Sequence, residues 1–137
     1  MWSYLFDNYI SRRPFVGYGF NAFWYIKAYQ EDVQRAAGYP DPIIIADNGF
    51  IDILVNTGYL GLFLFMVFYV WAGWRSVQYS IHAKDIINLF PALLMLFTTI
   101  ANITWSLLFE NEGFFLLMMI SVLFSISQRI QVARVHG

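Results

Sequence analysis

Two long runs of uncharged, mostly apolar residues constrain this chain more than any other feature. They cover residues 53–74 and 86–108, and neither contains an Asp, Glu, Lys or Arg. A helix needs about 20 apolar residues to cross the hydrocarbon core of a bilayer, and both runs are long enough. A third run begins at Phe114 and reaches that length if it continues past Arg129, whose side chain can extend toward the lipid headgroups. We therefore predict membrane-spanning helices near 53–74, 86–108 and 114–132.

The composition supports this prediction. Hydrophobic residues make up 59% of the 137 residues and charged residues 12%, whereas a soluble domain carries roughly 25% charged residues. A soluble fold this short buries too small a fraction of its surface to hide such an excess. The net charge of −1 argues against a nucleic-acid partner, and the absence of cysteine excludes disulfides and thiolate sites. We expect an all-α, multi-pass membrane protein.

The basic residues predict its orientation, because lysine and arginine concentrate in cytoplasmic segments. Outside the first 50 residues they lie in the 75–85 connector and in the tail, at Arg75, Lys84, Arg129 and Arg134. The 109–113 connector holds two glutamates and no basic residue. This pattern places residues 1–50 on the extracytoplasmic side. Since residues 1–8 lack the features of a secretory signal, we expect the chain to be the C-terminal part of a longer protein whose earlier helices carry this segment across.

Residues 1–50 form the predicted extracytoplasmic segment, ahead of the membrane region 51–137. The spacing of apolar residues predicts a helix over 2–10, ended by the Arg12-Arg13-Pro14 sequence. A loop over 15–20 contains two glycines suited to close backbone approach or positive φ. A second helix is expected over 22–37, closed by Gly38. The next begins at Asp47 or Asn48, both good N-cap residues.

Polar residues at helical spacing mark the membrane segments. Asn48, Asp52 and Asn56 share one helix face. A second polar stripe runs along 86–108 through Asn88, Thr99, Asn102 and Ser106. Interhelical hydrogen bonding is its simplest explanation, and lining a lipid-carrier cavity is the alternative. Gly58 and Gly61 predict close packing of helices.

Three blocks in the first half of the chain resemble the bacterial O-antigen ligase and polysaccharide polymerase family (the Wzy/WaaL type), most closely its exopolysaccharide polymerases. The blocks are RPFVGYGFNAFW at 13–24, ADNGFID at 46–52 and GYLGL at 58–62. The family pattern reads R-P-x-x-G-x-G-x-x-x-F-W, then A-H-N-G-x-x-D, then G-x-x-G. The chain departs from it at Asp47, which stands where the family usually has histidine, and it lacks a further arginine a few residues before Trp2.

The resemblance implies a glycosyltransferase of the bacterial cytoplasmic membrane. Such an enzyme joins glycan repeat units carried on undecaprenyl diphosphate at the outer leaflet, without a metal or other cofactor. Its expected partners are membrane lipids, the preceding helices and other polysaccharide-export proteins. Two other possibilities remain at this point: a non-catalytic fragment of such a protein, or a membrane transport subunit.

Two residues are the candidates for catalysis. Arg13, with Arg12 beside it, offers guanidinium groups that bind phosphate oxygens bidentately; two arginines at a membrane surface also suit lipid phosphates. Asp47 occupies the position of the general base that accepts the proton of the attacking hydroxyl. An N-cap role explains an aspartate there equally well.

Four further residues are candidates for substrate binding. Asn48 and Asp52 suit hydrogen bonds to sugar hydroxyls, or hydrogen bonds that position other sugar-binding groups. Polar residues that only mark the membrane edge would give the same sequence pattern. Tyr18 and Trp24 suit stacking on sugar rings or guidance of the polyprenyl tail. Aromatic residues also gather at membrane interfaces without binding any substrate.

Overall fold

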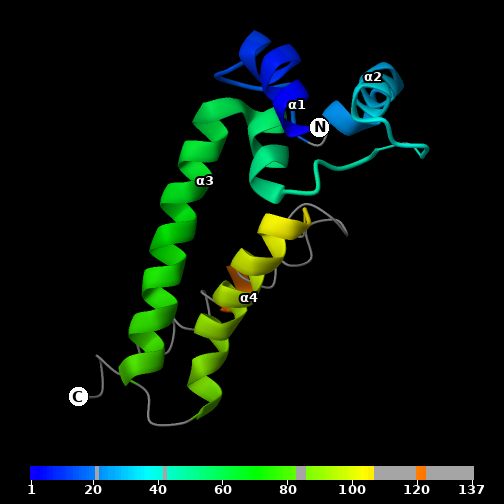
Figure 1. Ribbon diagram of the computed structural model, residues 1–137. Coiled ribbons are helices and arrows are strands. Elements are labelled where there is room, and N and C mark those ends of the chain that lie inside the picture. The colour runs from blue at the N-terminus through cyan, green and yellow to red at the C-terminus, as the bar shows by residue number, and fades with distance from the viewer. Residues whose placement is uncertain (21, 42, 83–85, 107–119, 123–137) are drawn as a thin grey trace.

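The computed structural model describes residues 1–20, 22–41, 43–82, 86–106 and 120–122. These residues are all-α, with no strand among them. In chain order, the elements are α1 (Trp2–Asn8), η1 (Ile10–Arg12), η2 (Phe23–Tyr25), α2 (Lys27–Ala37), α3 (Gly49–His82), η3 (Ile86–Leu89) and α4 (Phe90–Thr104). Figure 1 shows α3 and α4 side by side, with α1 and α2 gathered at one end of the pair. Of the predicted 114–132 span, all but residues 120–122 lies outside the described residues.

The helices of the outer segment end where proline and glycine require it. The α1–η1 stretch stops at Arg12, and Arg13 before Pro14 leaves the helical region at φ −135° and ψ 62°. α2 ends at Gly38, which takes the left-handed conformation at φ 72° and donates its N–H to the Gln34 carbonyl. The stop before Pro14 and the closure at Gly38 were predicted from the sequence, but the single helix predicted over 2–10 is divided at Tyr9, which leaves helical geometry at φ −121° and ψ −56°.

The single helix predicted over 22–37 is wrong, because Ile26 divides it. Ile26 is extended at φ −87° and ψ 105°, between η2 and α2. In η2 Phe23 and Trp24 are buried, whereas α2 buries only Val33. The division lets each segment direct its own apolar side chains into the core.

The core of the outer segment is aromatic and extends onto the beginning of α3. Its buried members are Leu5, Tyr9, Ile10, Phe23, Trp24, Val33, Ile43, Ala46, Leu54 and Val55. The Tyr9 ring makes edge-on contacts with Tyr4, Tyr18, Phe23 and Tyr29, at centroid separations of 4.9–6.3 Å. Such pairs contribute about 0.5–1.5 kcal/mol each beyond the burial of their area. The outer helices are therefore packed on α3 rather than tethered to it by a loose linker.

α3 is interrupted at Gly58, where the prediction of one continuous helix over 53–74 is wrong. Gly58 takes φ 69° and ψ −172°, a combination that essentially only glycine adopts. In Figure 1 the chain rises through residues 49–57, bends sharply and descends as the long helix 59–82. Gly61, predicted to pack against another helix, instead lies against the Thr57 side chain across this break.

The loop 14–19 supplies the hydrogen bonds that the break removes. In a continuous helix the amides of residues 59 and 60 would donate to the carbonyls of residues 55 and 56. Here Tyr59 N–H donates to the Pro14 carbonyl at 2.6 Å, and Leu60 N–H donates to the Phe15 carbonyl at 3.3 Å. The carbonyls of residues 55 and 56 accept instead from Tyr18 N–H at 3.0 Å and Gly19 N–H at 2.8 Å. The loop backbone is thus inserted between the two parts of α3.

Glycine makes this insertion sterically possible. A Cβ atom on Gly17, at φ 62°, would lie 2.6 Å from backbone atoms of Asn56 and Thr57. A Cβ atom on Gly58 would lie 2.4 Å from the Phe15 carbonyl carbon. Two blocks separated by about forty residues in the sequence therefore meet backbone to backbone.

α3 and α4 form an antiparallel pair joined by polar contacts. Tyr69 OH lies 2.9 Å from Thr99 Oγ1, and Tyr79 OH donates to Asn88 Oδ1 at 2.8 Å. Ser106, just beyond α4, donates its hydroxyl to Asp52. Hydrogen bonds between elements therefore account for Asn88, Thr99 and Ser106 of the predicted polar stripe. This is the simpler of the two explanations given for the stripe.

α4 is shorter than the predicted span over 86–108. Residues 86–89 form the 3-10 turn η3, and α4 covers 15 residues before Trp105 becomes extended at φ −154° and ψ 150°. At 1.5 Å per residue α4 is about 22 Å long, whereas the helix 59–82 is about 36 Å long. The extended Trp105 brings Ser106 to Asp52, so the contact with α3 replaces a further helical turn.

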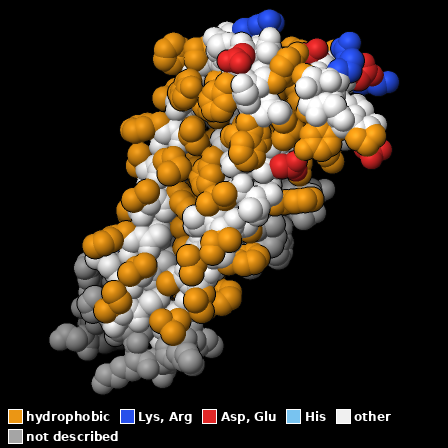
Figure 2. All heavy atoms as spheres, in the orientation of Figure 1, with side chains coloured by type: hydrophobic (Ala, Val, Ile, Leu, Met, Phe, Trp, Pro, Cys, Tyr) orange, Lys and Arg blue, Asp and Glu red, His pale blue; other side chains and the backbone are white. Residues whose placement is uncertain are grey.

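Much of the surface of α3 and α4 is apolar. Large hydrophobic side chains are exposed along both helices, among them Phe63, Val70, Trp74, Leu93 and Ile100, each at least 55% exposed. Figure 2 shows hydrophobic side chains along the length of the pair, with charged side chains gathered at the end formed by α1 and α2. In the described part of the chain one helix, over residues 49–81, is long and apolar enough to cross a membrane.

Candidate functional site

The Asp52 carboxylate joins three separate segments of the chain. It lies in the first turn of α3 and is 2% exposed. Oδ1 accepts a hydrogen bond from Trp24 Nε1 at 2.6 Å, and both oxygens accept from the Ala46 N–H, at 3.1 and 3.2 Å. Oδ2 also accepts from the Ser106 hydroxyl. A buried carboxylate needs such donors to offset the loss of its hydration.

These contacts give Asp52 and Trp24 a supporting position. Trp24 is 5% exposed, and its indole N–H is already bonded to Asp52. Neither side chain presents a free polar group at the surface. Of the two roles weighed for Asp52 from the sequence, the geometry favours support of the neighbouring 46–48 turn over direct contact with a sugar.

Asn48 caps α3. Its Oδ1 accepts from the Phe50 and Ile51 amides at 3.0 and 3.3 Å, as expected of an N-cap side chain. Its Nδ2 donates to the Ile103 carbonyl at 3.2 Å, so the cap also ties the beginning of α3 to the end of α4. Close contact continues at Gly49, where a Cβ atom would overlap the Asn102 side chain.

Asp47 is not the cap of α3. It has φ 53°, and it is the one residue other than glycine with positive φ in the described part of the chain. Such a conformation is uncommon outside glycine and is tolerated best by short polar residues. The Asp47 side chain is partly exposed and lines an open hollow of about 460 Å³ together with Met1, Trp2, Ser3 and Tyr39. With its capping role taken by Asn48, Asp47 occupies a strained backbone position beside a solvent-accessible hollow.

Arg12 and Arg13 are exposed at the end of α1–η1. The Arg13 guanidinium carbon lies 5.0 Å from the centre of the Tyr18 ring, within the range of a cation–π contact. The inserted loop follows directly and exposes Phe15 by 74% and Val16 by 68%. Tyr18 itself is partly buried and donates its hydroxyl to the Tyr9 carbonyl at 3.3 Å. This corner of the molecule combines cations with exposed apolar side chains.

The two candidate catalytic residues lie at opposite ends of the α1–η1 stretch. Asp47 is beside Met1 and Trp2 at its beginning, and Arg13 follows its last residue. Seven α-helical and three 3-10 residues correspond to roughly 15 Å of helix. A ligand that contacts both groups in this arrangement spans the length of the α1–η1 stretch.

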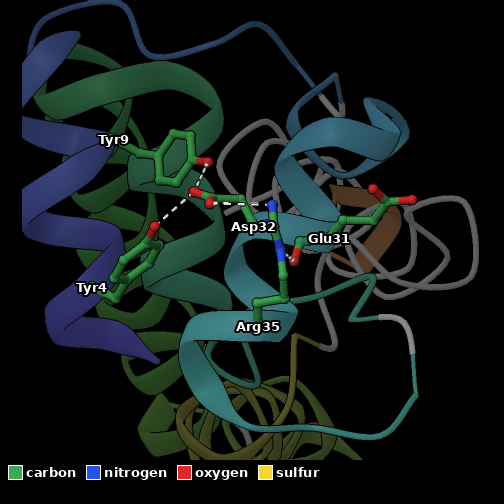
Figure 3. Close-up of polar contacts among 5 residues, drawn as sticks. All are labelled: Tyr4, Tyr9, Glu31, Asp32 and Arg35. Atoms are coloured by element: carbon green, nitrogen blue, oxygen red, sulfur yellow. Dashed lines mark hydrogen bonds and ion pairs between the residues drawn. The ribbon is translucent and has the colours of Figure 1, made fainter.

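A second carboxylate, missed in the sequence, links α2 to α1. Asp32 Oδ2 accepts the hydroxyls of Tyr4 at 2.7 Å and Tyr9 at 2.6 Å, and Arg35 lies 3.7 Å from Oδ1. Figure 3 shows both rings pointing toward Asp32. The hydrogen bonds from Tyr9 and Tyr4 lower the pKa of the Asp32 carboxyl. Burial, followed by the bond to Asp32, raises the pKa of Tyr9. No periodic pattern in the sequence relates Asp32 to Tyr4 and Tyr9.

Comparison of the chain with protein families, with curated proteins and with solved structures finds no match.

Proposed function

We propose that this chain is part of a membrane glycosyltransferase that joins lipid-diphosphate-linked glycan units, as O-antigen ligases and polysaccharide polymerases do. In this proposal the helix 59–82, the η3–α4 stretch 86–104 and the 114–132 segment cross the bacterial cytoplasmic membrane. The outer segment, residues 1–50, then faces the periplasm or exterior. The exposed apolar surface of α3 and α4 supports this arrangement, because such a surface is costly in water and favourable in lipid.

One observation carries the proposal: the three blocks on which the resemblance rests form a single structural unit. Trp24 of the first block and Ala46 of the second both donate to the buried Asp52 carboxylate. The loop of the first block is inserted at Gly58 of the third. Direct contacts thus join the blocks 13–24, 46–52 and 58–62, which are separated in the sequence but together match the family pattern.

The corner at Arg12 and Arg13 has the chemistry required for a polyprenyl diphosphate. Guanidinium groups bind phosphate oxygens and remain charged at any working pH. Phe15 and Val16 beside them are exposed and apolar, as contact with a prenyl tail or the lipid surface requires. In the transfer the Arg13 side chain stabilises the negative charge that develops on the departing diphosphate.

Asp47 is the proposed general base. It accepts the proton of the acceptor sugar hydroxyl as the new glycosidic bond forms. Since roughly 15 Å of helix separates Asp47 from Arg13, the outer segment must move for the two groups to act on one bond, or an extended donor must lie along α1. Asn48 and Asp52 hold the 46–48 turn in position.

The test uses the intact membrane protein in its native cell. Arg13→Ala is expected to abolish polymer formation, and Asp47→Asn, which keeps the side-chain shape but cannot accept the proton, is expected to do the same. Carrier-linked glycans then accumulate as single repeat units for a polymerase, or as long unligated chains for a ligase. Lys27→Ala is the matched control, because the side chain of Lys27 is 86% exposed and its only described ion pair is with Glu31 one turn away. Normal polymer in Arg13→Ala, with the protein present in the membrane, would refute the proposal.

A further inference from the structure

The outer segment carries two neighbouring hollows that share one aromatic wall. The first, of about 460 Å³, is lined by Met1, Trp2, Ser3, Tyr39 and Asp47. The second, of about 600 Å³, is lined by Glu31, Gln34, Arg35, Gly38, Tyr39 and Pro40. Both volumes fall within the roughly 300–1,000 Å³ range of ligand sites. Tyr39 lines both, so the two hollows adjoin at this residue.

The side chains along this path are those that bind sugars. A pyranose has an apolar C–H face, which stacks on aromatic rings, and a rim of hydroxyl groups. Trp2 and Tyr39 are 44% and 50% exposed as residues. Asp47 offers a carboxylate to sugar hydroxyls. Gln34 offers its amide oxygen, because its Nε2 is bonded to the Tyr39 and Pro40 carbonyls. Arg35 offers the guanidinium donors that Glu31 and Asp32 leave available.

Hydrogen bonds hold the Trp2 indole and the backbone that carries Tyr39. Trp2 Nε1 donates to the Ala46 carbonyl at 2.7 Å, which fixes the indole beside Asp47. Gln34 Nε2 donates to the carbonyls of Tyr39 and Pro40 at 3.3 and 3.0 Å. The left-handed Gly38 turns the chain just before Tyr39. A ring and a loop backbone that are fixed in advance lose little entropy when a ligand binds.

We infer that these two hollows form a saccharide-binding groove that holds a linear oligosaccharide across Tyr39, with one end at Asp47. The inference rests on the proposed function for the kind of ligand. It adds the path of that ligand: the acceptor glycan extends from Asp47 between Trp2 and Tyr39 and continues over α2 toward Arg35. The groove binds the glycan through rings and hydroxyl contacts, whether or not transfer takes place.

The test measures binding of two probes, maltohexaose and chitohexaose, to the full chain in lipid nanodiscs by saturation-transfer NMR. At least one hexasaccharide is expected to bind, and Tyr39→Ala is expected to weaken it by about tenfold, the effect of losing an aromatic anchor. Tyr25→Ala is the matched control, because Tyr25 lies on the same segment, is 79% exposed and lines neither hollow. It should change the affinity by less than about twofold.

The outcomes separate this inference from the proposed function. Failure of both probes to bind, or equal binding by Tyr39→Ala and the unaltered chain, overturns the groove, whatever the polymer assay shows. An equal loss in Tyr25→Ala and Tyr39→Ala also overturns it, because the sugars would then adsorb to any exposed ring. Hexasaccharide binding that depends on Tyr39, in a protein whose Asp47→Asn variant still makes polymer, supports the groove and refutes Asp47 as the base.

Discussion

Gly58→Ala should release the inserted loop from α3. A Cβ atom there would lie 2.4–2.6 Å from backbone atoms of Phe15 and Pro14, and backbone cannot yield as a flexible side chain can. The unfavourable φ and ψ combination costs about 1–3 kcal/mol. Moving the loop away also loses up to four hydrogen bonds, each contributing about 0.5–1.5 kcal/mol. The total is roughly 3–9 kcal/mol.

Gly38→Ala provides the matched control. Gly38 has nearly the same φ, 72° against 69°, but no atom lies within 4 Å of its would-be Cβ. Its substitution carries only the left-handed penalty of about 1–2 kcal/mol. The lost hydrogen bonds make the difference between the two variants, and a value of about 3 kcal/mol for them corresponds to about a 150-fold change in an opening equilibrium.

Hydrogen exchange measures this difference directly. In the full chain in nanodiscs, the Tyr18 and Gly19 amides should exchange about 150-fold faster in Gly58→Ala than in Gly38→Ala. The α2 amides report whether the remaining structure is intact. Equal exchange of the loop amides in the two variants would refute the view that insertion, rather than glycine conformation alone, sets the stability of this junction.

Two further predictions concern the buried and half-buried carboxylates. Asp52→Ala leaves the donors of Trp24, Ala46 and Ser106 without their acceptor, and the thermal midpoint in nanodiscs should fall by the equivalent of about 3–5 kcal/mol; the exposed Asp41→Ala should change stability by less than about 0.5 kcal/mol. The lowered pKa of Asp32 means that its contribution to stability is present above the ordinary aspartate pKa and is lost as the pH falls through the lowered value. Tyr9→Phe removes the leading cause, so a carboxyl NMR titration should show the Asp32 pKa rising; an unchanged value would contradict the assigned cause.

Local chemistry made several features predictable. The stop of the α1–η1 stretch before Pro14 and the closure of α2 at Gly38 each depend on one residue and its immediate neighbours. The glycines of the 15–20 loop were also expected to allow positive φ or close approach, and Gly17 does both. In such cases the sequence contains the whole physical cause.

Features that depend on distant partners were not predictable. The apolar run around Gly58 reads as one helix, because the loop that stabilises the break lies forty residues earlier in the chain. The sequence predicts Asp52 as a polar residue at the membrane edge. Its burial is apparent only in the structure, where Trp24 and Ser106 lie beside it. Asp47 and Asn48 were equal candidates for the cap, and the positive φ of Asp47 distinguishes them.

The bonds to Asp52 also set an order for biosynthesis. Trp24 and Ala46 precede Asp52, but Ser106 leaves the ribosome more than fifty residues later. Until α4 has been synthesised, a nascent chain has a carboxylate with only part of its complement of donors. The set of donors around Asp52 is therefore complete only after the hairpin of α3 and α4 has closed.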